Sequence, residues 1–153
     1  MGIGMSLDAD RLVKVSFSFY SADMDALVSQ TEELKKLGAA VRRGTVLRAL
    51  IELTSETEMF AYTVLLNRDH VVKACPREIE NVTGIPTVDL PPRLVRKLDQ
   101  VIAELAAKDI KATRAYVVRA VLRNAPRPSE WINAVNQYLK DFPRKSRVAG
   151  NTF

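Results

Sequence analysis

Apolar and polar side chains alternate near the start of the chain, in the segment LVKVSFSF at residues 12–19. A period of two places the apolar side chains on one face of an extended chain and the polar ones on the other. The pattern therefore predicts a strand with one buried and one exposed face. The apolar positions are Val13, Val15, Phe17 and Phe19, and the polar positions are Lys14, Ser16 and Ser18.

The spacing then becomes helical. Apolar residues recur every three or four positions over residues 24–37, and Gly38 follows them, as is typical of a helix end. Ser21 offers an N-cap for this helix. A second helix is predicted to begin near residues 42–45. Residues 12–53 thus form a unit of one strand and two helices.

The same order of elements returns later in the chain. PTVDL at residues 86–90 predicts a second short strand, and the two prolines after it suit the first turn of a helix. Thr113 offers an N-cap for a further helix. Residues 85–125 superpose on the first unit without a gap, each residue standing 71 positions after its counterpart, as Leu98 does after Leu27.

The two units also share residues that apolar periodicity does not require. Arg43 and Arg114 are counterparts, and so are Arg48 and Arg119. We interpret the units as an internal repeat. Residues 54–84 connect them and carry a capping-box pattern typical of a helix. The chain is thus divided into a flexible N-terminus (1–11), the first repeat (12–53), a helical connecting segment (54–84), the second repeat (85–125), a C-terminal helix (126–142) and a basic tail (143–153).

The composition excludes several classes of function. The chain has one cysteine and one histidine, which exclude an intrachain disulfide and a Cys/His metal site within one chain. No GxSxG, HExxH or P-loop pattern is present, so we expect neither an enzyme nor a cofactor. No apolar run is long enough for a membrane span, and no secretory signal begins the chain. We expect a small, soluble, cytoplasmic protein without a membrane partner.

The charge balance favours an anionic partner. The formal net charge is +5. Residues 85–124 contain eight basic and four acidic residues, and the tail adds three basic residues without an acidic one. A basic excess of this kind suits a polyphosphate backbone, because binding releases counterions. The same excess also occurs in proteins that bind nothing anionic, so charge alone leaves both interpretations open.

The segment TVDLPPRLVRKLDQVIAEL, followed by TRAYVVRAVLRNA, resembles the strand and two helices of the ribbon-helix-helix superfamily, the MetJ/Arc class of DNA-binding proteins. VSFSFYSADMDALVSQTEEL and RRGTVLRALIEL are a looser match. The resemblance implies a mainly α fold with a short two-stranded antiparallel ribbon, here a tandem pseudodimer with extra helices. It is similar to the tandem form of TraY-like conjugation proteins and of T-DNA transfer accessory proteins. The resemblance implies that the partner is double-stranded DNA. It implies that the role is repression, or the transfer or maintenance of a plasmid or mobile element.

In this superfamily the outer face of the ribbon enters the major groove and contacts bases. The resemblance assigns that face to Lys14, Ser16 and Ser18 of the first strand and to Thr87 and Asp89 of the second. Asp89 departs from the family, which favours basic or neutral polar residues there. A carboxylate can accept from cytosine N4. It can equally mean that this repeat has lost base recognition.

The family's second helices bind phosphates at their N-termini, where backbone amides and the helix dipole favour anions. The corresponding residues are Arg42, Arg43, Gly44 and Thr45 in the first repeat, and Thr113 and Arg114 in the second. Simple capping with a solvated arginine is the alternative. We expect Arg48 and Arg119, further along these helices, to lie at the surface or in intrachain ion pairs.

Two features outside the repeats could add contacts. Arg144, Lys145 and Arg147 of the tail could hold DNA non-specifically or only aid solubility. The C-terminal helix carries an apolar stripe, which either packs on its own chain or docks a protein partner or a second copy. A protein-interaction module that retains the fold without DNA binding is therefore the alternative function. The stripe consists of Trp131, Ile132, Val135, Tyr138, Leu139 and Phe142.

Overall fold

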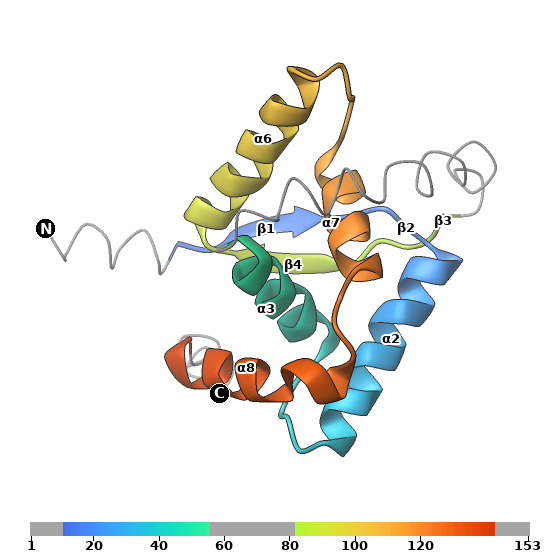
Figure 1. Cartoon of the computed structure of the whole chain (residues 1–153), viewed down its shortest axis with the longest axis vertical. Helices are drawn as coiled ribbons and strands as arrows, with labels where there is room; N and C mark the ends of the chain where they lie inside the picture. The colour runs from blue at the N-terminus through green and yellow to red at the C-terminus, as the bar shows by residue number, and fades with distance from the viewer. Residues whose placement is uncertain (1–10, 56–81, 143–153) are drawn as a thin grey trace, which may run out of the picture.

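A computed structural model describes residues 11–55 and 82–142 of the chain (Figure 1). The fold is mainly helical with a short antiparallel ribbon, which confirms the fold class expected from the sequence. The expected N-terminal and tail residues 1–10 and 143–153 lie outside the described part, as do residues 56–81 of the connecting segment. The elements are β1 (Val13–Ser16), β2 (Phe19–Tyr20), α2 (Ser21–Lys36), α3 (Arg43–Ser55), β3 (Val82–Gly84), β4 (Thr87–Leu90), α6 (Pro92–Ala106), α7 (Arg114–Arg123) and α8 (Pro128–Asp141).

The two strands of the repeats pair with each other inside one chain. β1 and β4 run antiparallel, with Lys14 opposite Asp89 and Ser16 opposite Thr87. Ser16 and Thr87 stand 71 positions apart, which is also the offset of the sequence repeat, and their hydroxyls are 2.9 Å apart in a hydrogen bond. A pseudo-twofold axis therefore passes through this pair and relates one repeat to the other.

β2 and β3 lengthen the ribbon beyond an interruption. Phe19 pairs with Gly84, which keeps the register of β1 and β4. Pro86 has no backbone N–H to donate, although its carbonyl accepts from the Phe17 amide at 3.1 Å. The strand β3 lies in the segment for which we predicted a helical connection, so that prediction is wrong at its end. Pairing with β2 gives these residues the hydrogen bonds that a helix would have supplied.

The helices of both repeats pack on the inner face of the ribbon and on one another (Figure 1). Counterpart leucines occupy equivalent buried places, for example Leu27 in α2 and Leu98 in α6, both fully buried. Burial of a Leu or Phe side chain contributes about 1.5–3 kcal/mol relative to exposure. The shared apolar core is therefore what holds the two repeats together.

The helix starts differ in their capping residues. Thr113 caps α7 as predicted, because its Oγ1 accepts from the Tyr116 amide at 3.0 Å. Ser21 does not cap α2 in the way the sequence suggested. The helix begins at Ser21, and the carboxylate of buried Asp23 accepts from the Tyr20 amide at 3.0 Å.

The C-terminal helix α8 lies across α2 and α3 (Figure 1). Trp131, Val135 and Tyr138 of its apolar stripe are buried, and the Trp131 indole donates to Gln30 of α2 at 3.1 Å. The stripe therefore packs on its own chain. Phe142, at 40% exposure, is the stripe residue left largely outside the core.

Candidate nucleic-acid interface

The ribbon separates its side chains onto two faces as the alternation predicts, except that Val13 at the start of β1 is 38% exposed. The inner residues are all buried: Val15, Phe17, Phe19, Val88 and Leu90. The outer residues Lys14, Ser16, Ser18 and Thr87 are exposed, and Asp89 is half-buried. The structure thus brings all five predicted base-contact residues onto one outer face, contributed by both strands.

The two ends of this outer face differ in charge. At one end Lys14 stands opposite Asp89, so a cationic and an anionic side chain are neighbours across the strands. The Asp89 carbonyl also accepts from Arg48 Nη1 at 3.4 Å. The adjacent carboxylate offsets the positive charge of Lys14 at this end.

The other end carries an apolar residue that the sequence reasoning missed. Ile85 is 64% exposed. It is the counterpart of Lys14 under the repeat offset, and applying the offset to each outer residue would have found it. An exposed apolar side chain beside polar strand residues can contact a thymine methyl group, which is the main apolar feature of the major groove.

Arg48 and Arg119 have a different role from the one we expected. Arg119 is buried, and its Nη1 donates to the Ser18 carbonyl at 2.9 Å. Its guanidinium carbon lies 4.6 Å from the centre of the Tyr20 ring. Arg48 makes the equivalent contact to Asp89 on the other strand. Each arginine thus holds the strand of the opposite repeat in place. This contact preorganises the ribbon and does not add surface charge.

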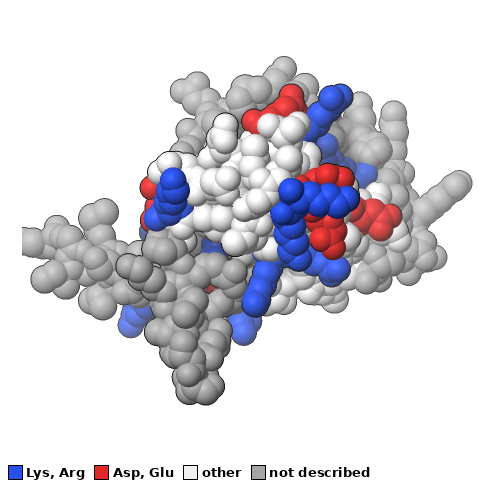
Figure 2. All heavy atoms as spheres, turned by 90° about the horizontal axis from the view of Figure 1, so that it is seen from below, with Lys and Arg blue, Asp and Glu red and all other residues white. Residues whose placement is uncertain are grey.

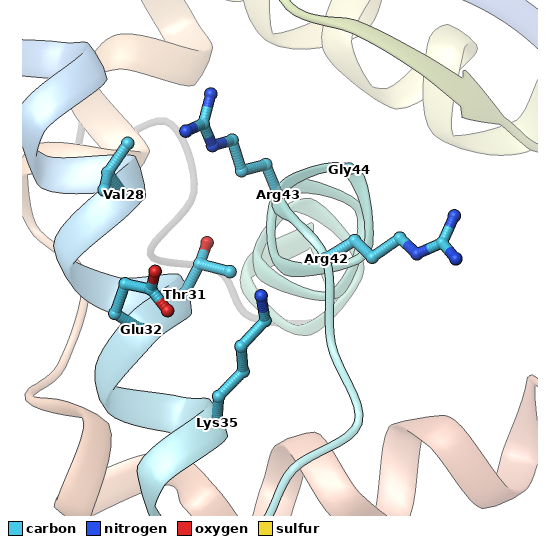
Figure 3. Close-up of a pocket in the computed structure, with 7 residues that line it drawn as sticks. All are labelled: Val28, Thr31, Glu32, Lys35, Arg42, Arg43 and Gly44. Carbon is cyan, nitrogen blue, oxygen red and sulfur yellow. The ribbon is translucent and has the colours of Figure 1, made fainter.

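The N-terminus of α3 borders a cavity of about 380 Å³ between α2 and α3 (Figure 3). Lys35 and Arg43 reach into this space, whereas Arg42 points away from α2. Arg42 and Arg43 are exposed, and their side chains form no hydrogen bond or ion pair with any residue in 11–55 or 82–142. A Cβ added at Gly44 would meet nothing within 4 Å, so the backbone there is open to a ligand. This end of α3 can therefore accept an anion.

Thr45 does not belong to that surface. It is 2% exposed, and its hydroxyl oxygen is buried. Its side chain therefore points into the protein, so its hydroxyl is not available to a phosphate. Only the backbone amide at this position can contribute.

The N-terminus of α7 is occupied by an internal ion pair. Arg114 Nε and Nη2 each donate to the Asp99 carboxylate of α6 at 2.8 Å. These hydrogen bonds, together with the charge of Arg114, hold the pKa of Asp99 below its ordinary value despite some desolvation. The counterpart of Asp99 in the first repeat is Val28, which lines the cavity beside Arg43. The two potential phosphate sites are therefore unequal. Glu32 also lines the first cavity, but it forms no ion pair with Arg43 in the described residues, whereas the Asp99 carboxylate at the second site is bonded directly to Arg114.

Basic and acidic side chains are mixed on the face seen from below (Figure 2). Lysines and arginines stand next to aspartates and glutamates, with a broad uncharged area between them. Among the residues that Figure 2 colours, this face therefore shows no continuous basic patch. The predicted basic contacts Arg144, Lys145 and Arg147 lie outside the described residues.

Comparisons with protein-family models, with curated proteins and with solved structures find no match to this chain. Within residues 11–55 and 82–142, no helix has the length and apolar character needed to cross a bilayer. The same part of the chain contains no group of three or more His, Cys, Asp or Glu side chains placed to hold a metal ion. The features that bear on function are therefore the ribbon and the two helix N-termini.

Proposed function

We propose that this protein binds double-stranded DNA through a ribbon-helix-helix pseudodimer formed within one chain. One observation carries the proposal. The antiparallel ribbon is formed by two repeats of one chain, and its register coincides with the offset of the sequence repeat. A two-stranded ribbon has the width to enter the major groove. Its exposed polar face supplies donors and acceptors for base edges.

The helix N-termini support the same orientation on DNA. The N-termini of α3 and α7 lie on opposite sides of the ribbon (Figure 1). Phosphate contacts on both sides of the groove position a protein while the element in the groove reads bases. Arg42, Arg43 and Gly44 would supply the stronger contact, because Arg114 of the second site is paired with Asp99. The protein would act as a transcriptional repressor or as an accessory factor in the transfer or maintenance of a plasmid or mobile element.

The test is DNA binding by the full chain as a function of salt. Fluorescence anisotropy with random duplex should give micromolar affinity, and the logarithm of the association constant should fall linearly with the logarithm of the salt concentration. Selection of bound fragments from random duplex should then yield an asymmetric site, because the two strands present different side chains. Absence of salt-dependent binding to any duplex would refute the proposal.

The second candidate function is a protein-interaction module that has lost DNA binding. Two observations favour it: the carboxylate of Asp89 on the outer face, and the Asp99 carboxylate that neutralises Arg114. The salt titration distinguishes the two candidates, since this alternative predicts no binding to duplex at low salt.

A further inference from the structure

Two ion pairs join the repeats at equivalent junctions. In one, Arg123 of α7 donates through Nε to Asp23 Oδ1 in the first turn of α2 at 2.8 Å. In the other, Arg93 in the first turn of α6 makes two hydrogen bonds to the Glu52 carboxylate of α3, at 2.5 and 2.6 Å. The carboxylates are almost completely buried, with side-chain exposures of 0% for Asp23 and 2% for Glu52.

The junctions are related by the pseudo-twofold axis, but their charges are reversed. Glu52 and Arg123 are counterparts under the repeat offset, so each ends the second helix of its repeat. Each faces the first turn of the first helix of the other repeat. In that turn, the acid lies in the first repeat (Asp23) and the base lies in the second (Arg93). Each repeat therefore carries two like charges, and only the opposite repeat supplies their partners.

The apolar helix core does not make this distinction. Counterpart helix residues are similar in both repeats, such as Leu27 and Leu98 or Val46 and Val117, and all four are fully buried. A ribbon of two first repeats from two chains would bury the equivalent helix faces, although its inner face would carry Phe17 and Phe19 twice, without their smaller counterparts Val88 and Leu90. Such a ribbon would, however, place Glu52 of each chain against Asp23 of the other. A ribbon of two second repeats would place Arg123 against Arg93.

We propose that these two junctions are a recognition code that pairs a first repeat with a second repeat and excludes pairing of like repeats. Like charges in a buried junction disfavour the wrong partner, whereas opposite charges satisfy each other with the right one. The exclusion matters during synthesis, because the first repeat leaves the ribosome before the second exists. Without this exclusion, first repeats of neighbouring chains would pair with one another. The inference concerns the pairing of the repeats and does not depend on DNA binding.

The code predicts that one charge reversal redirects pairing between full-length chains. Arg93→Glu sets a second carboxylate against Glu52 inside the chain. The same change allows two second repeats to pair, because Arg123 of each chain then meets the new carboxylate of the other. Glu52→Arg has the opposite effect and favours pairing of two first repeats. The double variant Glu52→Arg/Arg93→Glu restores the intrachain ion pair between these two positions and keeps the one between Asp23 and Arg123, and its linker should return it to the monomer.

Cysteines on the pseudo-twofold axis report which repeats have paired. The Ser16 and Thr87 hydroxyls are 2.9 Å apart, so two cysteines at equivalent places in a ribbon of like repeats would be close enough for a disulfide. In a Cys75→Ser background, Thr87→Cys reports pairing of second repeats and Ser16→Cys pairing of first repeats. Chains are unfolded, refolded and oxidised, and disulfide-linked dimer is measured on a non-reducing gel beside the molar mass from light scattering.

Arg93→Glu is the decisive variant, because the Arg93 side chain is 47% exposed whereas that of Glu52 is 2% exposed, so a substitution at Arg93 disturbs the core less than one at Glu52. Arg93→Gln is the matched control, since it removes the ion pair without adding repulsion. In the Thr87→Cys background, we expect roughly tenfold or more linked dimer for Arg93→Glu than for Arg93→Gln. In the Ser16→Cys background, we expect no such increase.

Two results would overturn the proposal. One is an equal amount of linked dimer for Arg93→Glu and Arg93→Gln in the Thr87→Cys background. The other is an equal increase in the Ser16→Cys and Thr87→Cys backgrounds, because the code allows Arg93→Glu to join only second repeats. Failure of the double variant to return to the monomer would also count against it.

Discussion

The N-termini of α3 and α7 differ, because within the described part of the chain only at α7 is the arginine paired with a carboxylate. This difference leads to a prediction about Asp99. In the structure its carboxylate takes two hydrogen bonds from Arg114, both at 2.8 Å. Asp99→Asn keeps the shape of the side chain and removes its charge, which releases the guanidinium toward a phosphate at the N-terminus of α7. The side chains of Arg114 and Asp99 are 39% and 50% exposed, so the pair is solvent-screened and contributes about 0–1 kcal/mol to folding. The variant should therefore change DNA binding without changing the fold.

The size of the effect follows from counterion release. Each phosphate neutralised by a cationic side chain contributes about 0.9 to the slope of log K against log salt concentration. Asp99→Asn adds one available cation and should steepen the slope by roughly one. Arg43→Ala should make it shallower by roughly one, since Arg43 has no partner within the described residues. Arg114→Ala should have a smaller effect in the wild-type chain and the full effect in the Asp99→Asn background.

The assay is fluorescence anisotropy on one random duplex at four or five salt concentrations. Circular dichroism melting of each variant controls for folding. The pH provides a second control. Because Arg114 lowers the pKa of Asp99, the stabilisation by this pair is complete above the ordinary Asp pKa and is lost only as the pH falls through the lower folded value. The difference between Asp99→Asn and wild type should thus stay constant from about pH 5 to pH 8. Equal slopes for Arg43→Ala, Arg114→Ala and wild type would show that the helix N-termini do not contact phosphates.

Three further predictions concern single positions. Gly44→Ala should stabilise the protein by about 0.4–1 kcal/mol in thermal melts, because a Cβ there meets nothing within 4 Å, yet weaken DNA binding if a phosphate approaches that backbone; tighter or unchanged binding would contradict this. Ile85→Ala should reduce the preference for thymine over uracil at one position of a selected site by about 0.8 kcal/mol, and an unchanged preference would remove Ile85 from the groove. Burial raises the pKa of Tyr138 to about 12, so its contribution to stability is present below pH 10 and lost as the pH rises from 10 to 12. Tyr138→Phe should therefore lose less stability than wild type across that interval in denaturant titrations, and parallel losses would contradict the buried phenol.

Local patterns in the sequence determined the elements and the sides that they bury. The alternation from Val13 to Phe19 placed Phe17 and Phe19 inside and Lys14, Ser16 and Ser18 outside, because successive side chains of a strand point to opposite faces. Helical spacing placed Leu27 and Leu34 in the core. The offset of 71 residues also predicted which residues are equivalent, and the ribbon register agrees with it at Ser16 and Thr87. These properties depend on neighbours in the chain, which a sequence displays directly.

Only the tertiary structure decided which charges meet. Nothing near Glu52 in the sequence indicates Arg93 as its partner, and nothing near Arg114 indicates that Asp99 occupies its guanidinium. Arg119 was expected at the surface or in an intrachain ion pair, but it is buried against the Ser18 carbonyl and the Tyr20 ring of the other repeat. Charged side chains are long and follow no periodicity, so their partners depend on how distant elements pack. Hydrophobic periodicity therefore predicts a fold of this size and the exposed face of its ribbon, whereas its ion pairs require the assembled molecule.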